Sequence, residues 1–380
     1  MNRVFLPGTT IGVMGGGQLG RMFAVAARRM GYRAHIFSPE ENGPAAQFAD
    51  VSTVADYRDE NAVRRFARSV DLITFEFENI PAETVSWCAY HTVVRPSGKV
   101  LEIAQHRLRE KTFLSENGFP LPQFKSVRDR AELESAVELI GRAAILKTAA
   151  FGYDGKGQQA IASRELDDVW ETRSGEELVL ERTVEFEREI SVIVARGPAG
   201  GTEVFPIAEN IHRNHILDVT IVPARIRPAV ADKAKELTCA IAEKLELVGV
   251  LAVELFVEKN GDLLVNELAP RPHNSGHWSI EGCVTSQFEQ HVRAVCGLKL
   301  GPTEQLRPAA MMNLLGEIWQ KGEPDWAAAM EVPNVHLHLY GKVEPRPRRK
   351  MGHLTALANT TDEAVKRVRE AREKLCAQNS

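Results

Sequence analysis

The sequence predicts a protein of mixed α/β and α+β class, with a doubly wound α/β domain at the N-terminus and a small α+β domain at the C-terminus. Three observations predict it. Strand and helix signals alternate over the first hundred residues, as in a parallel sheet covered by helices. This alternation breaks near residues 96–98, and a charged helix and a new set of strands follow. The 380 residues also exceed the size at which a single hydrophobic core keeps growing.

The N-terminal domain is expected to span residues 1–105 and to begin with a strand, a glycine turn and a helix. Apolar residues of this helix recur every three or four positions, the spacing of an amphipathic helix: Leu19, Met22, Phe23, Ala26 and Met30. Short apolar runs predict further strands at Leu72–Phe75 and His91–Val94. The resulting order of elements is that of a doubly wound sheet.

The central region is expected to span residues 106–300, and the C-terminal domain residues 301–380. The central region should contain a charged helix over residues 105–116 and a helix over residues 231–247. Strands are expected between these helices: Ala144–Lys147, Leu178–Glu181 and Ile190–Val194. The last helix should begin with a capping box, in which the side chains of Thr360 and Glu363 accept hydrogen bonds from free backbone N–H groups at the start of the helix.

Composition excludes several classes of function. The formal net charge of −4 gives no reason to expect nucleic acid as a partner. The five cysteines are scattered and show no Cys-x-x-Cys spacing, which argues against a disulfide framework or a zinc site and for a reducing compartment. No apolar run reaches the roughly 18 residues of a membrane-spanning helix, and no signal peptide pattern opens the chain. We therefore expect a cytoplasmic protein that does not enter a membrane.

A glycine turn, Gly15-x-Gly17-x-x-Gly20, follows the first strand and opens the first helix. This is the context of a dinucleotide-binding turn, in which free backbone N–H groups and the helix dipole bind a phosphate. The acidic residue that binds the ribose of NAD is expected about 20 positions later, but Glu40 lies beyond the second strand. A phosphate-bearing ligand other than NAD and a turn that only permits close packing both stay open.

A second glycine-rich segment, GYDGKGQ at residues 152–158, follows a strand that ends near Lys147. Its three glycines allow backbone N–H groups to turn toward phosphate oxygens, and Lys147 can reach the same phosphates. The segment is not a P-loop, because it lacks the ending G-K-[ST]. The alternative is a surface hairpin with a solubilising lysine, for which Tyr153 and Asp154 are unusual choices. We expect a phosphate-binding flap.

The segment GVLAVELFVEKNGDLLVNEL predicts two strands that bracket Asn260-Gly261, a strong hairpin signal. Counting equally outward from this turn places Glu254 directly opposite Glu267, with Cβ atoms roughly 5 Å apart. Like charges so placed destabilise a sheet unless a cation lies between them, and Mg²⁺ prefers carboxylate and phosphate oxygens. Two solvated glutamates on an exposed face are the alternative, which the apolar flanking residues disfavour.

The hairpin is followed by RPHNSGHW, residues 271–278, which the proline and glycine residues make a loop. Its donors suit a small anion, and the first of them are Arg271, His273 and Asn274. A zinc site formed by His273 and His277 is a weaker alternative, since no cysteine or third histidine is near in sequence.

These motifs, in this order, resemble those of the ATP-grasp superfamily and, within it, of the N5-carboxyaminoimidazole ribonucleotide synthetases. The resemblance spans residues 11–355 and rests on six segments: MGGGQLGRM, TFEFENI, GYDGKGQ, NELAPRPHNSGHW, TSQFE and RRKMGHL. It implies an ATP-grasp architecture and an ATP-dependent carbon–nitrogen ligase of purine biosynthesis. Its substrates would be ATP, bicarbonate and 5-aminoimidazole ribonucleotide, its metal Mg²⁺, and its assembly a homodimer.

The resemblance also implies an ATP site and its metal. Residues 181–184 would bind adenine, and Glu189 would bind the ribose. The residues matching positions that hold the nucleotide are Arg107, Lys147, Gly152, Tyr153, Asp154, Gly155, Lys156, Gly157, Gln158, Glu181, Arg182, Thr183, Val184, Glu189, His212, Asn266 and Glu267. Glu254 and Glu267 match the Mg²⁺ ligands.

For the second substrate site, the resemblance implies that the glycine turn near residue 15 binds a ribonucleotide phosphate. The ribonucleotide would also contact Glu76, Tyr153, Asp154, Lys350 and Arg349. Residues expected to act in catalysis are Arg271, His273 and Asn274 at bicarbonate, Asp154 near the reacting amine, and Lys350. The sequence departs from the pattern at two positions. Phe151 stands where relatives often have a second glycine, and Ala269 stands where many ATP-grasp enzymes place an asparagine metal ligand, which this subfamily also lacks.

Three other functions stay open from the residues alone. A ligase of the same superfamily that uses formate, such as a glycinamide ribonucleotide transformylase, would share most motifs. An NAD-dependent oxidoreductase would use the first glycine turn but leave Glu254 and Glu267 without a role. A nucleotide sensor would bind ATP without turnover.

Overall fold

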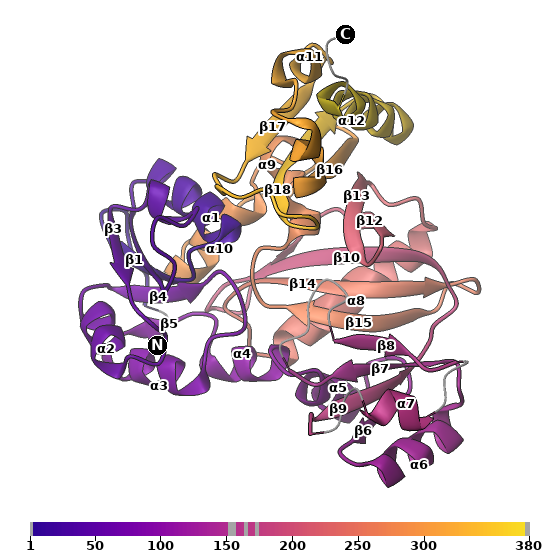
Figure 1. The fold of residues 1–380 in the computed structure, drawn as a ribbon. Coiled ribbons are helices and arrows are strands. Elements are labelled where there is room, and N and C mark those ends of the chain that lie inside the picture. The colour runs from indigo at the N-terminus through magenta and orange to yellow at the C-terminus, as the bar shows by residue number, and fades with distance from the viewer. Residues whose placement is uncertain (1–2, 151–156, 163–165, 172–174, 377–380) are drawn as a thin grey trace.

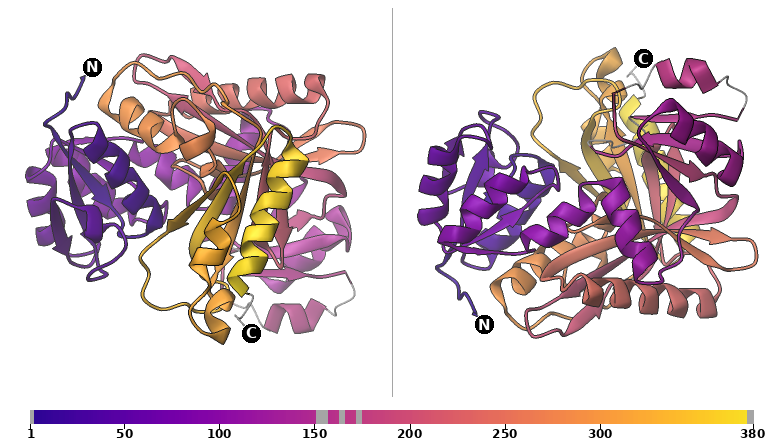
Figure 2. Two further views of the ribbon diagram at one scale, coloured as in Figure 1. Left: turned by 90° about the horizontal axis from the view of Figure 1, so that it is seen from above. Right: turned by 90° about the horizontal axis from the view of Figure 1, so that it is seen from below.

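The computed structural model describes residues 3–150, 157–162, 166–171 and 175–376 (Figure 1). Three sheets organise these residues, with five, four and nine strands. The N-terminal domain forms a lobe of its own beside the rest of the chain, as the views from above and below also show (Figure 2). Residues Gly152 to Lys156 of the expected flap lie outside the described residues.

The N-terminal sheet is parallel throughout and has the order β3-β2-β1-β4-β5, which confirms the predicted doubly wound domain. Its elements are β1 (Thr10–Met14), α1 (Gln18–Arg29), β2 (Arg33–Ser38), β3 (Val51–Val54), α2 (Glu60–Arg68), β4 (Leu72–Phe75), α3 (Ala82–His91) and β5 (Val93–Val94). The strand expected at His91–Val94 is shorter, because α3 continues through His91. Successive strands are added on one side of β1 as far as β3 and then on its other side, beginning with β4. Ligands bind at this change of side, between β1 and β4, in sheets of this kind.

A small antiparallel sheet follows, in the order β6-β9-β7-β8. It is preceded by two helices, α4 (Gly98–Ala104) and α5 (Arg107–Glu116), of which α5 is the predicted charged helix. Its elements are β6 (Phe124–Val127), α6 (Arg130–Ile140), β7 (Ala144–Thr148), β8 (Gln158–Ala160), α7 (Leu166–Glu171) and β9 (Leu178–Arg182). The strands predicted at Ala144–Lys147 and Leu178–Glu181 are therefore confirmed. Helices α6 and α7 cover one face and share a core with the sheet.

The nine-stranded sheet is antiparallel and joins the central and C-terminal regions. Its strands are β10 (Phe186–Arg196), β11 (Thr202–Val204), β12 (Ala208–Arg213), β13 (Ile216–Val222), β14 (Gly249–Glu258), β15 (Leu263–Ala269), β16 (Ala309–Leu315), β17 (Val335–Leu339) and β18 (Lys350–Leu357). The main path runs β15-β14-β10-β12-β13-β16-β18-β17. Because β13 pairs with β16, this sheet contains strands from both sides of residue 300. The domain boundaries expected at residues 105 and 300 stay predictions.

The α-helices that follow the small sheet in the chain belong to the central and C-terminal regions, which share the nine-stranded sheet. They are α8 (Pro228–Lys244), α9 (Ser279–Gly282), α10 (Gln287–Cys296), α11 (Trp326–Met330) and α12 (Thr361–Cys376). The helix predicted over residues 231–247 begins three residues earlier, with Pro228 in its first turn, where a missing N–H costs nothing. At α12, the predicted cap is present, since Thr360 Oγ1 accepts a hydrogen bond from Glu363 N at 3.2 Å.

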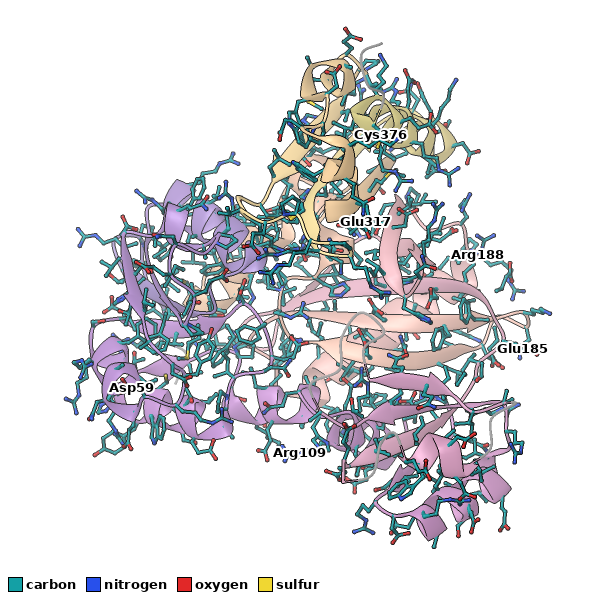
Figure 3. The ribbon with its side chains drawn as sticks, in the orientation of Figure 1. Asp59, Arg109, Glu185, Arg188, Glu317 and Cys376 are labelled. Atoms are coloured by element: carbon teal, nitrogen blue, oxygen red, sulfur yellow. The ribbon has the colours of Figure 1, made fainter. Side chains whose placement is uncertain are left out.

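Helix α10 connects the N-terminal domain to the rest of the chain. Its residues Phe288, Val292 and Val295 pack in one core with α1 and β1 of the N-terminal domain. All five cysteines are unpaired, and Cys376 at the end of α12 is exposed (Figure 3). Within the part of the chain that the structure describes, no helix combines the length and the apolar surface needed to cross a membrane.

Candidate active site

Two adjoining cavities of about 800 Å³ each lie where the three sheets meet. The first cavity, called the nucleotide cavity here, lies between the small sheet and the large one. The second, the interdomain cavity, lies between the N-terminal domain and the segment 346–350. Six residues line both: Arg107, Glu110, Glu267, His273, Asn274 and Lys350. The two cavities therefore meet at these residues.

Most described residues of the expected ATP site line the nucleotide cavity. These are Arg107, Lys147, Gln158, Glu181, Glu189, His212, Glu254, Asn266 and Glu267. Arg182 ends β9, Thr183 and Val184 follow it, and all three line neither cavity. Gly157 also lies outside both, where its positive φ of 72° and the closeness of Thr148 require glycine. Arg271 and Arg349 line the interdomain cavity, as does Glu76.

Glu254 pairs with Glu267 across β14 and β15, as the hairpin prediction requires. The length of the turn and the register of the strands near it differ from the prediction. Near the turn, Val257 pairs with Leu263, so the loop has three residues, 259–261, instead of two. A bulge at Asn266 then shifts the register by one residue and brings the two carboxylates opposite each other. The bulge also presents Asn266 to the nucleotide cavity.

The two opposed carboxylates repel each other, and this repulsion favours the protonated form of Glu254. Burial and the neighbouring charge of Glu267 raise the pKa of Glu254 to about 8, although His212 and Lys350 act in the opposite direction. Among the described residues, no group of three or more His, Cys, Asp or Glu side chains could hold a metal ion. Two opposed carboxylates nonetheless fit Mg²⁺, which takes one or two protein carboxylates and completes its shell with water and phosphate oxygens.

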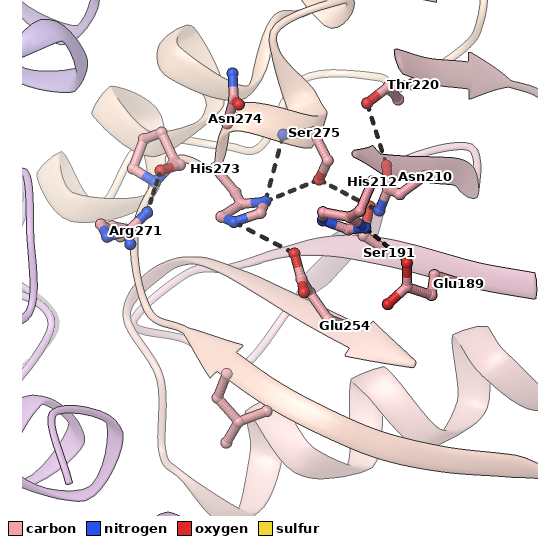
Figure 4. A network of polar contacts seen from close by, with 12 residues as sticks. Glu189, Ser191, Asn210, His212, Thr220, Glu254, Arg271, His273, Asn274 and Ser275 are labelled. Carbon is pink, nitrogen blue, oxygen red and sulfur yellow. Dashed lines mark hydrogen bonds and ion pairs between the residues drawn. The ribbon is translucent and has the colours of Figure 1, made fainter. Parts of the chain in front are cut away.

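His212 and Glu189 form a second polar pair at the rim of the nucleotide cavity. His212 Nδ1 lies 2.6 Å from Glu189 Oε2 (Figure 4). Burial alone would lower the pKa of His212, but the hydrogen bond and charge of Glu189 outweigh it and raise the pKa. The pair therefore presents a fixed ring and a carboxylate to whatever occupies the cavity.

Lys147 is held by a buried ion triad. Its Nζ lies 2.9 Å from Glu181 Oε2, and Lys111 Nζ lies 3.1 Å from the same oxygen. Burial would raise the pKa of Glu181, yet the two lysines outweigh burial and lower it. The carboxylate of Glu181 is thus occupied by lysines. Lys111 was not expected from the sequence, although it stands one helical turn after Arg107 on the same face of α5.

The loop after β15 is fixed by side chains from several strands (Figure 4). Ser275 N donates to His273 Nδ1 at 3.3 Å, which leaves the ring proton on Nε2, and Nε2 lies 3.5 Å from Glu254 Oε1. Burial and the charges of Arg271 and Lys350 hold the pKa of His273 well below its usual value, so the ring is neutral. Asn274 exchanges two hydrogen bonds with Asn313 of β16, at 3.0 and 2.7 Å.

Arg271 is oriented by the N-terminal domain. Its guanidinium makes a bidentate pair with Glu78, at 2.5 Å from Nε and 3.1 Å from Nη2. Glu78 belongs to the TFEFENI segment, but its partner lies 193 residues away, beyond the reach of any local pattern. The contact ties the anion loop to the edge of the first sheet.

The first glycine turn holds a carboxylate of the chain itself. Gly17 N and Gly20 N donate to the two oxygens of Glu76, at 2.5 and 2.7 Å. A Cβ atom at Gly15 or Gly17 would overlap with the Glu76 side chain, which explains the glycines. The phosphate expected on this turn would therefore have to compete with Glu76 for these two N–H groups. Burial raises the pKa of Glu76, and these hydrogen bonds oppose the rise.

The opposite wall of the interdomain cavity is cationic. Lys342 Nζ donates to Gln18 Oε1 and to Lys350 O, both at 2.6 Å. Burial and the charge of Arg349 lower the pKa of Lys342 to about 8. Lys342 was not expected from the sequence, because it precedes the segment RRKMGHL on which the resemblance rests. Its position beside α1 brings the C-terminal region against the N-terminal domain.

Known proteins match nearly the whole length of the chain. Family profiles match in three parts: the ribonucleotide synthetase preATP-grasp domain over residues 8–105, the ATP-grasp domain over 112–288, and the phosphoribosylaminoimidazole carboxylase C-terminal domain over 309–367. The N5-carboxyaminoimidazole ribonucleotide synthase of Bacillus subtilis is 43% identical over 367 residues, which cover 96% of each chain. The chain belongs to the N5-carboxyaminoimidazole ribonucleotide synthase family. The ATP-grasp architecture and the family suggested by the motifs are thus confirmed.

Further relatives extend this family in both sequence and structure. A bifunctional purine synthesis protein of Dictyostelium discoideum is 45% identical over 375 residues, and the chain spans 37% of its length. The N5-carboxyaminoimidazole synthetase of Staphylococcus aureus complexed with ADP matches with a TM-score of 0.92 and 39% identity, over 97% of this chain and 98% of that one. The synthase of Aspergillus clavatus in complex with ADP and 5-aminoimidazole ribonucleotide matches with a TM-score of 0.88 and 29% identity, over 99% of both.

Proposed function

We propose that this chain is an ATP-dependent carbon–nitrogen ligase that carboxylates the exocyclic amine of 5-aminoimidazole ribonucleotide in purine biosynthesis. The carboxyl source is bicarbonate, and the product is N5-carboxyaminoimidazole ribonucleotide. The observation that carries the proposal is the pair of adjoining cavities. One is lined by two opposed glutamates and a buried lysine, the other by cations and the N-terminal domain. Family membership and the ligands named for the Aspergillus and Staphylococcus structures support the same assignment.

The first step takes place in the nucleotide cavity. A bicarbonate oxygen attacks the γ-phosphorus of ATP, the bond to the bridging oxygen of ADP breaks, and carboxyphosphate forms. Lys147 and Arg107 bind the phosphates and offset the charge that develops during transfer. Glu254 and Glu267 would hold Mg²⁺, which when bound neutralises the phosphate oxygens and orients them. The triad with Glu181 keeps the ammonium of Lys147 in place before ATP arrives.

The second step takes place where the cavities meet. The exocyclic amine attacks the carboxyl carbon of carboxyphosphate, or CO₂ released from it, the bond to phosphate breaks, and the amine loses a proton. Arg271, His273 and Asn274 hold the carboxylate oxygens, and the neutral His273 donates from Nε2. Lys350, which lines both cavities, binds the ribonucleotide. Asp154 keeps the role near the amine that the family resemblance implies, and it lies outside the described residues.

Phosphate release from ATP tests this proposal. We expect release to require both bicarbonate and 5-aminoimidazole ribonucleotide for full rate, with one phosphate released per carboxylated product. Formate in place of bicarbonate should support no turnover, which separates this ligase from a transformylase of the same superfamily. ATP binding without any turnover would identify a sensor. Binding of NAD in a direct titration would favour the oxidoreductase instead.

The assembly is proposed to be a homodimer, as the family resemblance implies. Light scattering coupled to size exclusion should give twice the mass of 42.1 kDa. A mass of one chain at micromolar concentration would contradict it.

A further inference from the structure

Gln287, the first residue of α10, binds both backbone polar groups of His273. Its Oε1 accepts from His273 N at 2.9 Å, and its Nε2 donates to His273 O at 2.7 Å. The side chain is fully buried. Gln287 stands in the TSQFE segment, which no step of the reaction uses. The carboxamide thus pairs with His273 as a neighbouring strand would, at a position where the loop has no strand beside it.

The same carboxamide also fixes the far end of the loop. Its Nε2 lies 3.1 Å from Nδ1 of His277, which therefore acts as the acceptor and carries its ring proton on Nε2. Gln287 N donates to Ser279 Oγ at 3.0 Å, and this hydroxyl donates to Gly276 O at 2.6 Å. A Cβ atom at Gly276 would lie 2.5 Å from Gln287 Oε1, so the loop is folded closely around this one side chain.

Helix α10 itself has little freedom to move. Phe288, the next residue, is buried in the core shared with the N-terminal domain. One turn further on, His291 bridges two regions: it accepts from Val250 N at Nδ1 and lies 2.8 Å from Thr74 of β4 at Nε2. The position of Gln287 is therefore set by the packing of the N-terminal domain against the large sheet.

We infer that Gln287 is a positioning residue, which holds His273 and Asn274 where carboxyphosphate is retained until the amine attacks. The inference rests on the proposed role of His273 at the carboxyl group. A loop held loosely would still permit phosphoryl transfer, because Lys147, Glu254 and Glu267 lie on other elements. It would release the intermediate to water more often. The expected defect is therefore a loss of coupling, with ATP consumed and less product formed.

The chain supplies a matched control on the same helix. Gln290 is also fully buried, and it clamps one residue in the same way: Nε2 donates to Gly301 O at 2.7 Å, and Oε1 accepts from Gly301 N at 2.8 Å. Gly301 lines neither cavity. Replacement of either glutamine leaves two backbone groups without a side-chain partner, and replacement of Gln287 also leaves His277 Nδ1 without one, so both variants should lose stability. Only one of them touches the site.

The experiment compares Gln287→Met with Gln290→Met in the full-length protein. Phosphate released from ATP and carboxylated ribonucleotide formed are measured in the same reaction, along with the thermal midpoint. We expect the product formed per phosphate to fall roughly tenfold in Gln287→Met, since small displacements of positioned groups have effects of this size or larger. The product formed per phosphate should be unchanged in Gln290→Met, whose thermal midpoint should also fall. Equal coupling in the two variants would overturn the inference.

Two further variants keep the inference testable: Gln287→Glu and His273→Ala. Gln287→Glu keeps the shape and the acceptor but loses both N–H donors when ionised, so it should also uncouple, and it serves if the methionine variant does not fold. Coupled turnover in this folded variant would likewise overturn the inference. His273→Ala tests the proposed role of His273 separately from that of Gln287. Uncoupling in His273→Ala but not at Gln287 would leave the proposed function standing alone, whereas coupled turnover in His273→Ala would contradict the role of the loop.

Discussion

The β14–β15 hairpin and the first glycine turn are both places where the chain gathers groups of one electrical sign, yet they differ in how the charge is balanced. In the hairpin, Glu254 and Glu267 oppose each other across β14 and β15, and burial together with the charge of Glu267 raises the pKa of Glu254 to about 8. At the glycine turn, the N–H groups of Gly17 and Gly20 already bind the carboxylate of Glu76.

This difference separates a site that requires a ligand from one that the fold completes by itself. An opposed pair of carboxylates costs free energy until a cation arrives, so its retention is explained by binding. A turn whose donors are satisfied within the chain needs no ligand and contributes to stability. The following predictions test whether the two places behave in these two ways.

The largest effect is expected at the hairpin. Glu267→Gln removes one of the two charges that would hold Mg²⁺, and we expect kcat to fall at least about a hundredfold, the scale of losing one electrostatic stabiliser. Steady-state kinetics at saturating Mg²⁺ measure it, with circular dichroism to confirm the fold. Glu258→Gln, on the paired strand β14 of the same hairpin but outside both cavities, is the control and should retain activity. Near-normal turnover of Glu267→Gln would remove the basis for a metal here.

At the glycine turn, the expected effect is on stability as well as activity. Glu76→Ala leaves two N–H groups without their acceptor, and the free energy of unfolding should fall by about 2 kcal/mol. Urea unfolding measures it, and Glu83→Ala, exposed on α3 of the same domain, is the control. Inorganic phosphate should restore part of the loss in Glu76→Ala alone, because it can replace the carboxylate. An unchanged urea midpoint would mean that the turn does not depend on Glu76.

Lys350 tests the boundary between the two cavities, since it lines both. Its ammonium is a compact charge suited to a phosphate, so Lys350→Ala should mainly weaken ribonucleotide binding. We expect the KM for 5-aminoimidazole ribonucleotide to rise at least about tenfold, or roughly 1.4 kcal/mol, with the KM for ATP little changed. Lys366→Ala on the exposed face of α12 is the control. A rise in the KM for ATP alone would assign Lys350 to the nucleotide cavity.

Sequence patterns correctly predicted that Glu254 pairs with Glu267, although the length of the turn was predicted wrongly and the bulge was not predicted. The two errors cancel in the register of this pair. The Asn260-Gly261 signal suggested a two-residue turn, whereas the loop has three residues, and the bulge at Asn266 restores the register. Turn type depends on nearby residues and can be predicted, but a bulge depends on how the strand packs on its neighbours. The strands predicted at Leu72–Phe75, Ala144–Lys147 and Leu178–Glu181 followed more simply from short apolar runs.

The contacts that orient the site could not be predicted in the same way. Glu76, Glu78 and Gln287 act on partners 59, 193 and 14 residues away, and local spacing carries no information about such contacts. Lys111 illustrates a second cause. A charged helix is normally solvated, so no sequence pattern indicated that this lysine is buried against Glu181. The residue types at the site were therefore predictable, whereas their orienting partners required the three-dimensional structure.

His291 extends the comparison to a buried group that the fold satisfies in its neutral form, and here the smallest effect is expected. Val250 N donates to Nδ1, so the proton lies on Nε2 and faces Thr74. Burial lowers the pKa of His291 to about 3, against an ordinary value of 6.5. The unfolded chain therefore binds a proton that the folded chain excludes, and the stability due to this residue falls as pH drops from 6.5 toward 3.

From pH 7 to pH 6, one such histidine should lower the free energy of unfolding by about 0.7 kcal/mol. The measurement is the difference between the parent protein and His291→Gln at each pH, because the other buried histidines then cancel. Glutamine does not titrate and can still bridge Val250 and Thr74. We expect the advantage of histidine over glutamine to shrink toward pH 6. A difference that stays constant between pH 7 and pH 5 would show that His291 takes up its proton in the folded state, and that this joint between domains is wetter than its packing indicates.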